Sequence, residues 1–119
     1  MHCFSLIRWF ALVQTTTMNV INIYVDFNHI ASMHMTEYPV NSQYLPGTTF
    51  SDVVRLIHET ITAPDEQTFR GGAWLYTKRF PALTGWNFIR GKPCFRMRVC
   101  YLPHHNGLDN VIATAYPVV

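Results

Sequence analysis

Hydrophobic and polar residues alternate along the second half of the chain, a pattern that is typical of β-strands. Prolines, glycines and one Asn-Gly pair divide this half into four alternating segments. An earlier segment, residues 19–27, also alternates, and the polar stretch from 36 to 49 reads as a loop because it holds two prolines and a glycine. The expected strands of the second half are residues 73–79, 86–90, 94–101 and 110–118.

A single helix is expected between the loop and these strands. Ser51 has the residue type of an N-cap, Asp52 falls in the first turn, and Pro64 ends the helix. A helix followed by antiparallel strands is an α+β arrangement. The sequence therefore predicts an α+β fold with a helical N-terminal part followed by an antiparallel β-sheet. The apolar stripe of the helix consists of Val53, Val54, Leu56, Ile57 and Ile61.

The last strand places Thr114 and Tyr116 on one face and small apolar residues on the other. A two-residue turn before this strand would mix polar and apolar side chains on each face. A three-residue turn that ends in a left-handed Gly107 instead pairs Arg98 with Thr114 and Arg96 with Tyr116. We therefore predict the three-residue turn, a dry face that packs on the core, and a wet face that carries two arginines, a threonine and a tyrosine.

The composition indicates one folded domain with a clustered basic charge. A chain of 119 residues that is 49% hydrophobic and 14% aromatic can form a modest core, which excludes a disordered protein. The formal net charge is only +2, but a sheet built from the second half would carry a basic stripe that suits an RNA backbone. A solvated strand face is the alternative interpretation. The cations between positions 70 and 98 are Arg70, Lys78, Arg79, Arg90, Lys92, Arg96 and Arg98.

The first 17 residues are interpreted as a leader or appendage of uncertain role, and residues 18–119 as a single domain. The apolar run in residues 1–13 contains Arg8 and is too short to cross a bilayer. It also lacks the basic start and the long apolar run of a signal peptide. No membrane partner is therefore expected.

The three cysteines have neither disulfide nor zinc spacing. Cys94 and Cys100 fall on one expected strand, where residues spaced about 3.3 Å apart put their Cα atoms roughly 20 Å from each other. A disulfide cannot bridge that distance. We interpret the cysteines as reduced and structural, which favours a reducing compartment such as the cytoplasm.

The end of the chain resembles a known family of nucleases. Residues 112–117 read Ile-Ala-Thr-Ala-Tyr-Pro and follow a glycine turn and a basic strand, Phe95-Arg96-Met97-Arg98-Val99. This arrangement is similar to the C-terminus of bacterial EndoU-type toxin nucleases, which occur in contact-dependent inhibition and polymorphic toxins and belong to the barnase, EndoU, colicin and RelE group of small ribonucleases. The resemblance covers roughly residues 28–117. Its other features, in order, are Asn28-His29-Ile30, Pro46-Gly47-Thr48-Thr49-Phe50, a helix end at Ile61-Thr62-Ala63-Pro64, and Gly85.

The resemblance implies a barnase/EndoU/RelE-like domain that cleaves RNA without a cofactor or metal. Its catalytic residues would correspond to His29, Lys78, Thr114 and Tyr116. The family usually has a second histidine near a glycine-rich turn, but the corresponding Gly-Thr-Thr turn has none here. His34 takes its place, or another group handles the second proton.

Cleavage of this kind needs a base for the 2′-hydroxyl proton, an acid for the leaving 5′-oxygen, and positive charge around the transition state. Histidine suits both proton transfers because its ordinary pKa is about 6.5. Lys78 is the first choice for the transition-state cation, with Arg79 and Lys92 as competitors. The candidate substrate-binding residues are Arg79, Lys92, Arg96 and Arg98. The remaining histidines, interpreted as structural or solvated, include His58, His104 and His105.

The predicted function is a monomeric toxin endoribonuclease, with tRNA as one candidate substrate, that uses 2′-hydroxyl attack to leave a 2′,3′-cyclic phosphate. The resemblance implies a cognate immunity protein as partner, and delivery by a larger secreted protein into the cytoplasm of a target cell. The alternative is a non-enzymatic binding protein that uses the same basic sheet face for a protein or RNA partner. The mildly basic charge favours the nuclease, because an immunity protein for a basic nuclease would usually be acidic.

Overall fold

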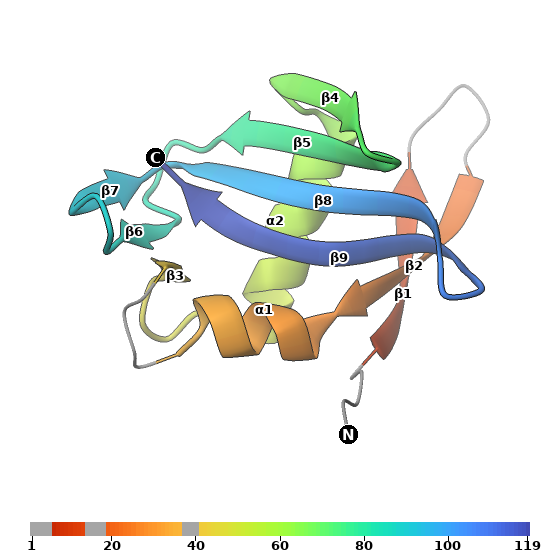
Figure 1. Ribbon diagram of the computed structural model, residues 1–119, viewed down its shortest axis with the longest axis horizontal. Coiled ribbons are helices and arrows are strands. Elements are labelled where there is room, and N and C mark those ends of the chain that lie inside the picture. The colour runs from red at the N-terminus through yellow and green to blue at the C-terminus, as the bar shows by residue number, and fades with distance from the viewer. Residues whose placement is uncertain (1–5, 14–18, 37–40) are drawn as a thin grey trace.

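The computed structural model describes residues 6–13, 19–36 and 41–119. Within these residues the chain forms two helices and two β-sheets (Figure 1). The helices are α1 (Phe27–His34) and α2 (Phe50–Thr62). The strands are β1 (Leu6–Val13), β2 (Asn19–Asp26), β3 (Ser42–Tyr44), β4 (Glu66–Arg70), β5 (Ala73–Arg79), β6 (Gly85–Asn87), β7 (Lys92–Cys94), β8 (Arg96–His105) and β9 (Leu108–Val118).

The larger sheet that the described residues form has six strands in the order β1-β2-β9-β8-β5-β4. All neighbours in it are antiparallel except β2 and β9, which run parallel where Tyr24 and Val25 pair with Val111 and Ile112. A smaller sheet has the order β3-β6-β7 and lies at the end of the larger one where β9 finishes (Figure 1). Helix α2 covers one face of the large sheet, and α1 runs beside β9.

The α+β class is confirmed, but two parts of the expected architecture are wrong. The described N-terminal part is not helical, because strands β1 and β2 precede α1. The sheet is mixed rather than antiparallel, because β2 joins it beside β9. The expected strand at residues 19–27 is confirmed as β2, whereas α1 was not expected. The expected boundary between residues 17 and 18 lies outside the described residues.

The hydrophobic core lies between α2 and the central strands. Apolar side chains of both helices meet the inward residues of β2, β8 and β9, and removal of this surface from water is the main stabilising contribution. Met97 and Val99 of β8 and Ala115 and Pro117 of β9 are buried at alternate positions, so the opposite face of these stretches carries the polar residues. The buried cluster contains Ile23, Val25, Phe27, Ile30, Tyr44, Val53, Leu56, Ile57, Phe80, Met97, Val99, Ile112 and Ala115.

The turn between β8 and β9 has two residues, so the expected three-residue turn is wrong. His105 pairs with Leu108, and the turn residues Asn106 and Gly107 have φ values of 52° and 77°. Positive φ at both positions is the geometry of a tight hairpin turn, which asparagine and glycine adopt most readily. The expected pairing partners of Arg96 and Arg98 are therefore wrong as well.

A β-bulge in β9 restores the predicted faces for the part of the strand that follows it. Cys100 pairs with Thr114, but the next residue, Tyr101, pairs with Ile112, so β9 has one extra residue at this point. Beyond the bulge, Arg98 pairs with Tyr116. One extra residue in the bulge has the same effect on the alternation as one extra residue in the turn. The predicted wet face, with Arg96, Arg98, Thr114 and Tyr116, is therefore correct beyond the bulge, although it arises from a different device. Before the bulge the faces differ from the prediction, because Ile112 rather than Val111 joins the core.

Helix α2 begins at a capping box that starts two residues before the expected cap. Thr49 Oγ1 accepts a hydrogen bond from the Asp52 backbone N–H at 3.1 Å, and Asp52 Oδ2 accepts one from the Thr49 N–H at 2.9 Å. These hydrogen bonds hold the pKa of Asp52 below its ordinary value. Thr49 is preferred to Ser51 as the cap because only Thr49 has a carboxylate at the third helical position.

We predict that Thr49→Ala lowers the free energy of unfolding by about 1 kcal/mol, because the helix loses its side-chain cap. Ser51→Ala is the matched control, since Ser51 is exposed and lies inside the first turn, and it should change stability by less than about 0.5 kcal/mol. Urea denaturation of the three proteins measures the difference. Equal losses in both variants would contradict the assignment of the cap to Thr49.

Candidate functional site

A row of polar side chains crosses three strands on the sheet face turned away from α2. Thr77 of β5, Arg98 of β8 and Tyr116 of β9 are direct cross-strand partners. Cross-strand partners point to the same face, so the three side chains are neighbours. Arg98 Nε lies 3.4 Å from Thr77 Oγ1, to which it donates a hydrogen bond. This hydrogen bond holds Nε of Arg98 towards β5, and Tyr116 is the cross-strand neighbour of Arg98 on its other side.

Helix α1 adds a histidine to this row. The helix buries Phe27 and Ile30 in the core, and His34 lies on the same stripe one turn further on. The ring of His34 stacks on that of Tyr116, with 4.9 Å between the centroids and 15° between the planes. The row therefore continues from the sheet onto the last turn of α1.

A backbone hydrogen bond fixes the tautomer of His34. Its Nδ1 lies 2.8 Å from the Ser42 carbonyl oxygen. A carbonyl oxygen only accepts, so Nδ1 must carry a proton and donate it. Burial lowers the pKa of His34, the Ser42 hydrogen bond opposes this shift, and the nearby His29 adds to it. In the resulting neutral ring, Nε2 has a free lone pair and can act as a base.

His29 is an exposed residue in the first turn of the same helix. Its ring centroid is 6.4 Å from that of His34. Its position is set by Asp26, the N-cap of α1, whose Oδ1 accepts a hydrogen bond from the His29 backbone N–H at 3.1 Å. A buried histidine that stacks on Tyr116 and an exposed histidine therefore lie side by side.

Rows on either side of Arg98 and Tyr116 carry two more expected site residues. Arg96 donates from Nε to the Val119 carbonyl oxygen at 3.1 Å, and a second guanidinium nitrogen donates to the same oxygen. On the other side of the Arg98–Tyr116 pair, Thr114 pairs with Cys100. The buried Oγ1 of Thr114 has no hydrogen-bond partner among the described residues. Buried hydroxyl groups are normally satisfied, so this oxygen has spare hydrogen-bonding capacity.

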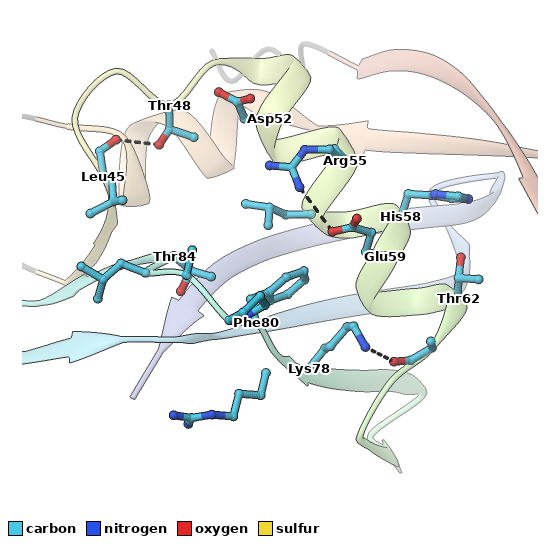
Figure 2. Close-up of a pocket in the computed structure, with 16 residues that line it drawn as sticks. Leu45, Thr48, Asp52, Arg55, His58, Glu59, Thr62, Lys78, Phe80 and Thr84 are labelled. Atoms are coloured by element: carbon cyan, nitrogen blue, oxygen red, sulfur yellow. Dashed lines mark hydrogen bonds and ion pairs between the residues drawn. The ribbon is translucent and has the colours of Figure 1, made fainter.

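Lys78 is not brought together with the histidines. It pairs with the core residue Met97 and therefore points to the α2 side of the sheet. There Lys78 Nζ donates to the Ala63 carbonyl oxygen at 2.9 Å, at the end of α2 (Figure 2). Cations are favourable at a helix C-terminus, which gives Lys78 a structural role. The expectation that Lys78 joins the catalytic group is thus not supported by its position.

The two competing cations occupy different places. Arg79 pairs with Arg96, and its guanidinium carbon lies 5.4 Å from the centroid of the Phe95 ring. Lys92 is exposed at the start of β7, in the smaller sheet. Of the nine expected site residues, the structure gathers His29, His34, Arg98 and Tyr116 most closely, with Arg96, Arg79 and Thr114 in adjoining rows.

A wide cleft lies on the α2 side, away from the histidines. It has a volume of about 790 Å³ and is lined by Phe80, by Lys78 and by the exposed Arg55–Glu59 ion pair (Figure 2). The histidine group instead lies on the half-buried face of a sheet. A sheet face suits contact with an extended polymer, whereas small ligands usually occupy concave pockets. Within the described residues, no group of three or more His, Cys, Asp or Glu side chains could hold a metal ion.

Sequence reasoning missed the groups that hold the site together. Ser42 acts through its backbone carbonyl, for which the side-chain sequence has no signal. Thr77 belongs to a strand whose two faces both carry apolar residues, so alternation alone does not reveal its partner Arg98. Asp26 could have been found, because an aspartate three residues before a histidine in a helical turn is a common cap.

Comparison with protein-family models, with curated proteins and with solved structures found no match to this chain. The resemblance to EndoU-type nucleases therefore stays a prediction. In the part of the chain that the structure describes, no helix is long and apolar enough to cross a membrane.

We predict that His34 makes stability fall as the pH is lowered below its ordinary pKa of 6.5. The pKa of His34 is lower in the folded chain, so the unfolded chain binds the proton first. The contribution of the neutral ring is complete above pH 6.5 and is lost as the pH falls through that value towards the folded pKa.

His34→Asn tests this linkage, because an asparagine can donate to the Ser42 carbonyl but does not titrate. The free energy of unfolding should depend less on pH in the variant than in the natural protein over this window. Urea denaturation at a series of pH values measures both curves. Parallel curves would show that His34 does not change its pKa on folding.

Proposed function

We propose that the protein is an endoribonuclease that cleaves RNA on the sheet face formed by His29, His34, Arg98 and Tyr116. The observation that carries this proposal is the state of His34. Burial lowers its pKa, its Nδ1 is hydrogen-bonded, and its ring is stacked on a tyrosine whose cross-strand partner is an arginine. A second histidine lies 6.4 Å away. These are the groups that metal-independent RNA cleavage requires.

The two histidines are assigned to the two proton transfers. His34 Nε2 takes the proton from the ribose 2′-hydroxyl as the 2′-oxygen forms its bond to phosphorus. His29, in its protonated form, gives a proton to the 5′-oxygen as the bond between that oxygen and phosphorus breaks. The products are a 2′,3′-cyclic phosphate and a free 5′-hydroxyl. An exposed histidine can exchange its proton with water between turnovers, which suits His29 to the second role.

Arg98, rather than Lys78, takes the role of transition-state cation. Its guanidinium group lies on the same face as the histidines, and Thr77 orients it. Tyr116 can donate its hydroxyl proton to a phosphate oxygen. The Thr114 hydroxyl is buried beside this face, so no direct contact with the phosphate is assigned to it. A preorganised cation and donors stabilise the charge that develops on the phosphate oxygens.

The charge distribution supports a polyanionic substrate. Residues 67–108 contain no Asp or Glu, and seven of the nine Lys and Arg residues of the chain fall among them. These residues include β5 and β8, which form the face just described. Binding of this kind releases counterions from the RNA phosphates. Added salt makes this release less favourable, so the affinity falls as the salt concentration rises. An acidic immunity protein that covers this face would be the matching partner, with the cytoplasm of a target cell as the place of action.

We predict that His29→Ala lowers the rate of RNA cleavage by about 10²- to 10⁴-fold, because one of the two proton transfers loses its group. His104→Ala is the matched control, since His104 is an exposed histidine in the β8–β9 hairpin. Arg98→Ala should also lose most of the activity, whereas Lys78→Ala should keep it. Gel analysis of labelled RNA measures the rates, and circular dichroism checks the fold of each variant.

Near-natural activity in His29→Ala would assign the proton transfer to another group. If Lys78→Ala loses cleavage activity and Arg98→Ala keeps it, the catalytic site lies on the α2 side of the sheet. RNA that binds but is never cut, under any of these conditions, would favour the non-enzymatic binding protein.

We predict that cleavage persists in EDTA, since two histidines supply the proton transfers and Arg98 supplies positive charge without a metal. The purified protein is incubated with total RNA and EDTA, and the RNA ends are mapped. The expected ends are 2′,3′-cyclic phosphates. Activity that vanishes in EDTA and returns with a divalent ion would show a metal-dependent reaction instead.

A further inference from the structure

The hairpin between β6 and β7 exposes three large apolar side chains. The exposed fractions are 40% for Trp86, 47% for Phe88 and 74% for Ile89. The tip is ordered by its own hydrogen bond, in which the Arg90 backbone N–H donates to Asn87 Oδ1 at 2.9 Å. Clusters of exposed apolar side chains in a folded domain are usually interaction sites.

The two aromatic side chains of this hairpin, Trp86 and Phe88, line a cleft that adjoins the proposed catalytic face. The cleft has a volume of about 470 Å³, and Trp86 and Phe88 form one side of it. Met35 and Gln43 also line it, and they directly follow His34 and Ser42 in the chain. Gln43 is the cross-strand partner of Trp86. The cleft therefore begins one residue away from the hydrogen bond that orients His34.

The hairpin is also held tightly against the end of β9 (Figure 1). Gly85, the first residue of β6, is packed so closely that a methyl group there would overlap the Gln43 carbonyl oxygen and the Pro117 ring. Pro117 directly follows Tyr116. The aromatic cleft and the catalytic face are thus fixed relative to each other through both β3 and β9.

The hairpin that carries the two rings also carries positive charge, which fits an anionic partner. Arg90 and Lys92 are exposed on the hairpin. The hairpin belongs to the stretch from 67 to 108 that has no carboxylate. Aromatic rings together with cations are the combination that binds single-stranded nucleic acid, because the rings stack on bases and the cations contact phosphates.

We propose that Trp86 and Phe88 form a base-stacking subsite for single-stranded RNA beside the bond that is cut. This proposal rests on the proposed ribonuclease function and adds the form of the substrate. A base that stacks on these rings must be unpaired, so duplex RNA is excluded. The concave position of both rings favours a nucleobase over a lipid surface, which would contact the most exposed residue, Ile89, at the tip.

Binding is measured separately from cleavage with a fluorescent single-stranded RNA that carries 2′-O-methyl groups and cannot be cut. Trp86→Ala and Phe88→Ala should each weaken binding by about 5- to 150-fold, the range found when a stacking ring is removed. Trp86→Phe should restore most of the affinity, because it keeps a ring. Phe69→Ala is the matched control, since Phe69 is 55% exposed but lies on β4. Thermal unfolding verifies that each variant is folded.

Three outcomes would overturn the subsite. The first is that the natural protein does not bind single-stranded RNA, or that both alanine variants bind it as tightly as the natural protein does. The second is equal affinity for duplex and single-stranded RNA. The third is binding to phosphatidylserine vesicles that depends on Ile89 and Trp86 while RNA binding does not.

The failure of the subsite can be distinguished from the failure of the proposed function. If cleavage requires His29 but neither alanine variant changes KM or RNA affinity, the subsite alone is overturned. The proposed catalytic mechanism fails if His29→Ala keeps full cleavage or if the natural protein does not cleave RNA. If Trp86→Ala nevertheless weakens the binding of single strands, the stacking subsite stands as a binding site.

Discussion

The pairing of β8 with β9 determines the rest of the structure. These strands supply Met97, Val99 and Ala115 to the core and Arg98 and Tyr116 to the opposite face. Side chains alternate with a period of two, so a shift of one residue would exchange the two sets. The bulge opposite Cys100 and Tyr101 corrects the alternation that the two-residue turn would otherwise impose. A dry core and a polar site therefore depend on the same local irregularity.

The second constraint is the edge of β9 that β2 leaves unpaired, and the elements that cover this edge also position the site. Only a short part of β9 pairs with β2, so backbone groups further along would lack partners. Helix α1 and strand β3 cover this stretch, and the buried Tyr44 hydroxyl donates to the Ala115 carbonyl oxygen at 2.6 Å. Burial raises the pKa of Tyr44, so the donor stays protonated. The elements that protect the edge are also those that bring His34 onto Tyr116.

The sequence was informative where the pattern was local. Strand β5 has the expected bounds, and the wet face of Arg98 and Tyr116 is the expected one, because alternation depends on neighbouring residues. Helix α2 is expected as well, but its cap is Thr49 rather than Ser51, because Thr49 and Asp52 form reciprocal hydrogen bonds. Local pattern was enough for these elements.

The remaining features depend on contacts that local pattern does not encode. Helix α1 has eight residues with two histidines, an asparagine and a serine, which weakens the periodic signal. Its formation depends on the burial of Phe27 and Ile30. The parallel pairing of β2 with β9 joins residues far apart in the chain. The face of Lys78 was also not predictable, because it depends on which side of the sheet α2 packs.

The direct junction between β2 and α1 has a consequence for motion. Asp26 is both the last residue of the strand and the cap of the helix, so no loop separates the sheet from the histidines. Hinges in proteins are usually a few loop or terminal residues that absorb changes in backbone angles. Here the cap hydrogen bond restrains the junction residue Asp26. The histidine pair is therefore preorganised on a rigid frame, and an incoming polymer has to adapt its own backbone to the protein.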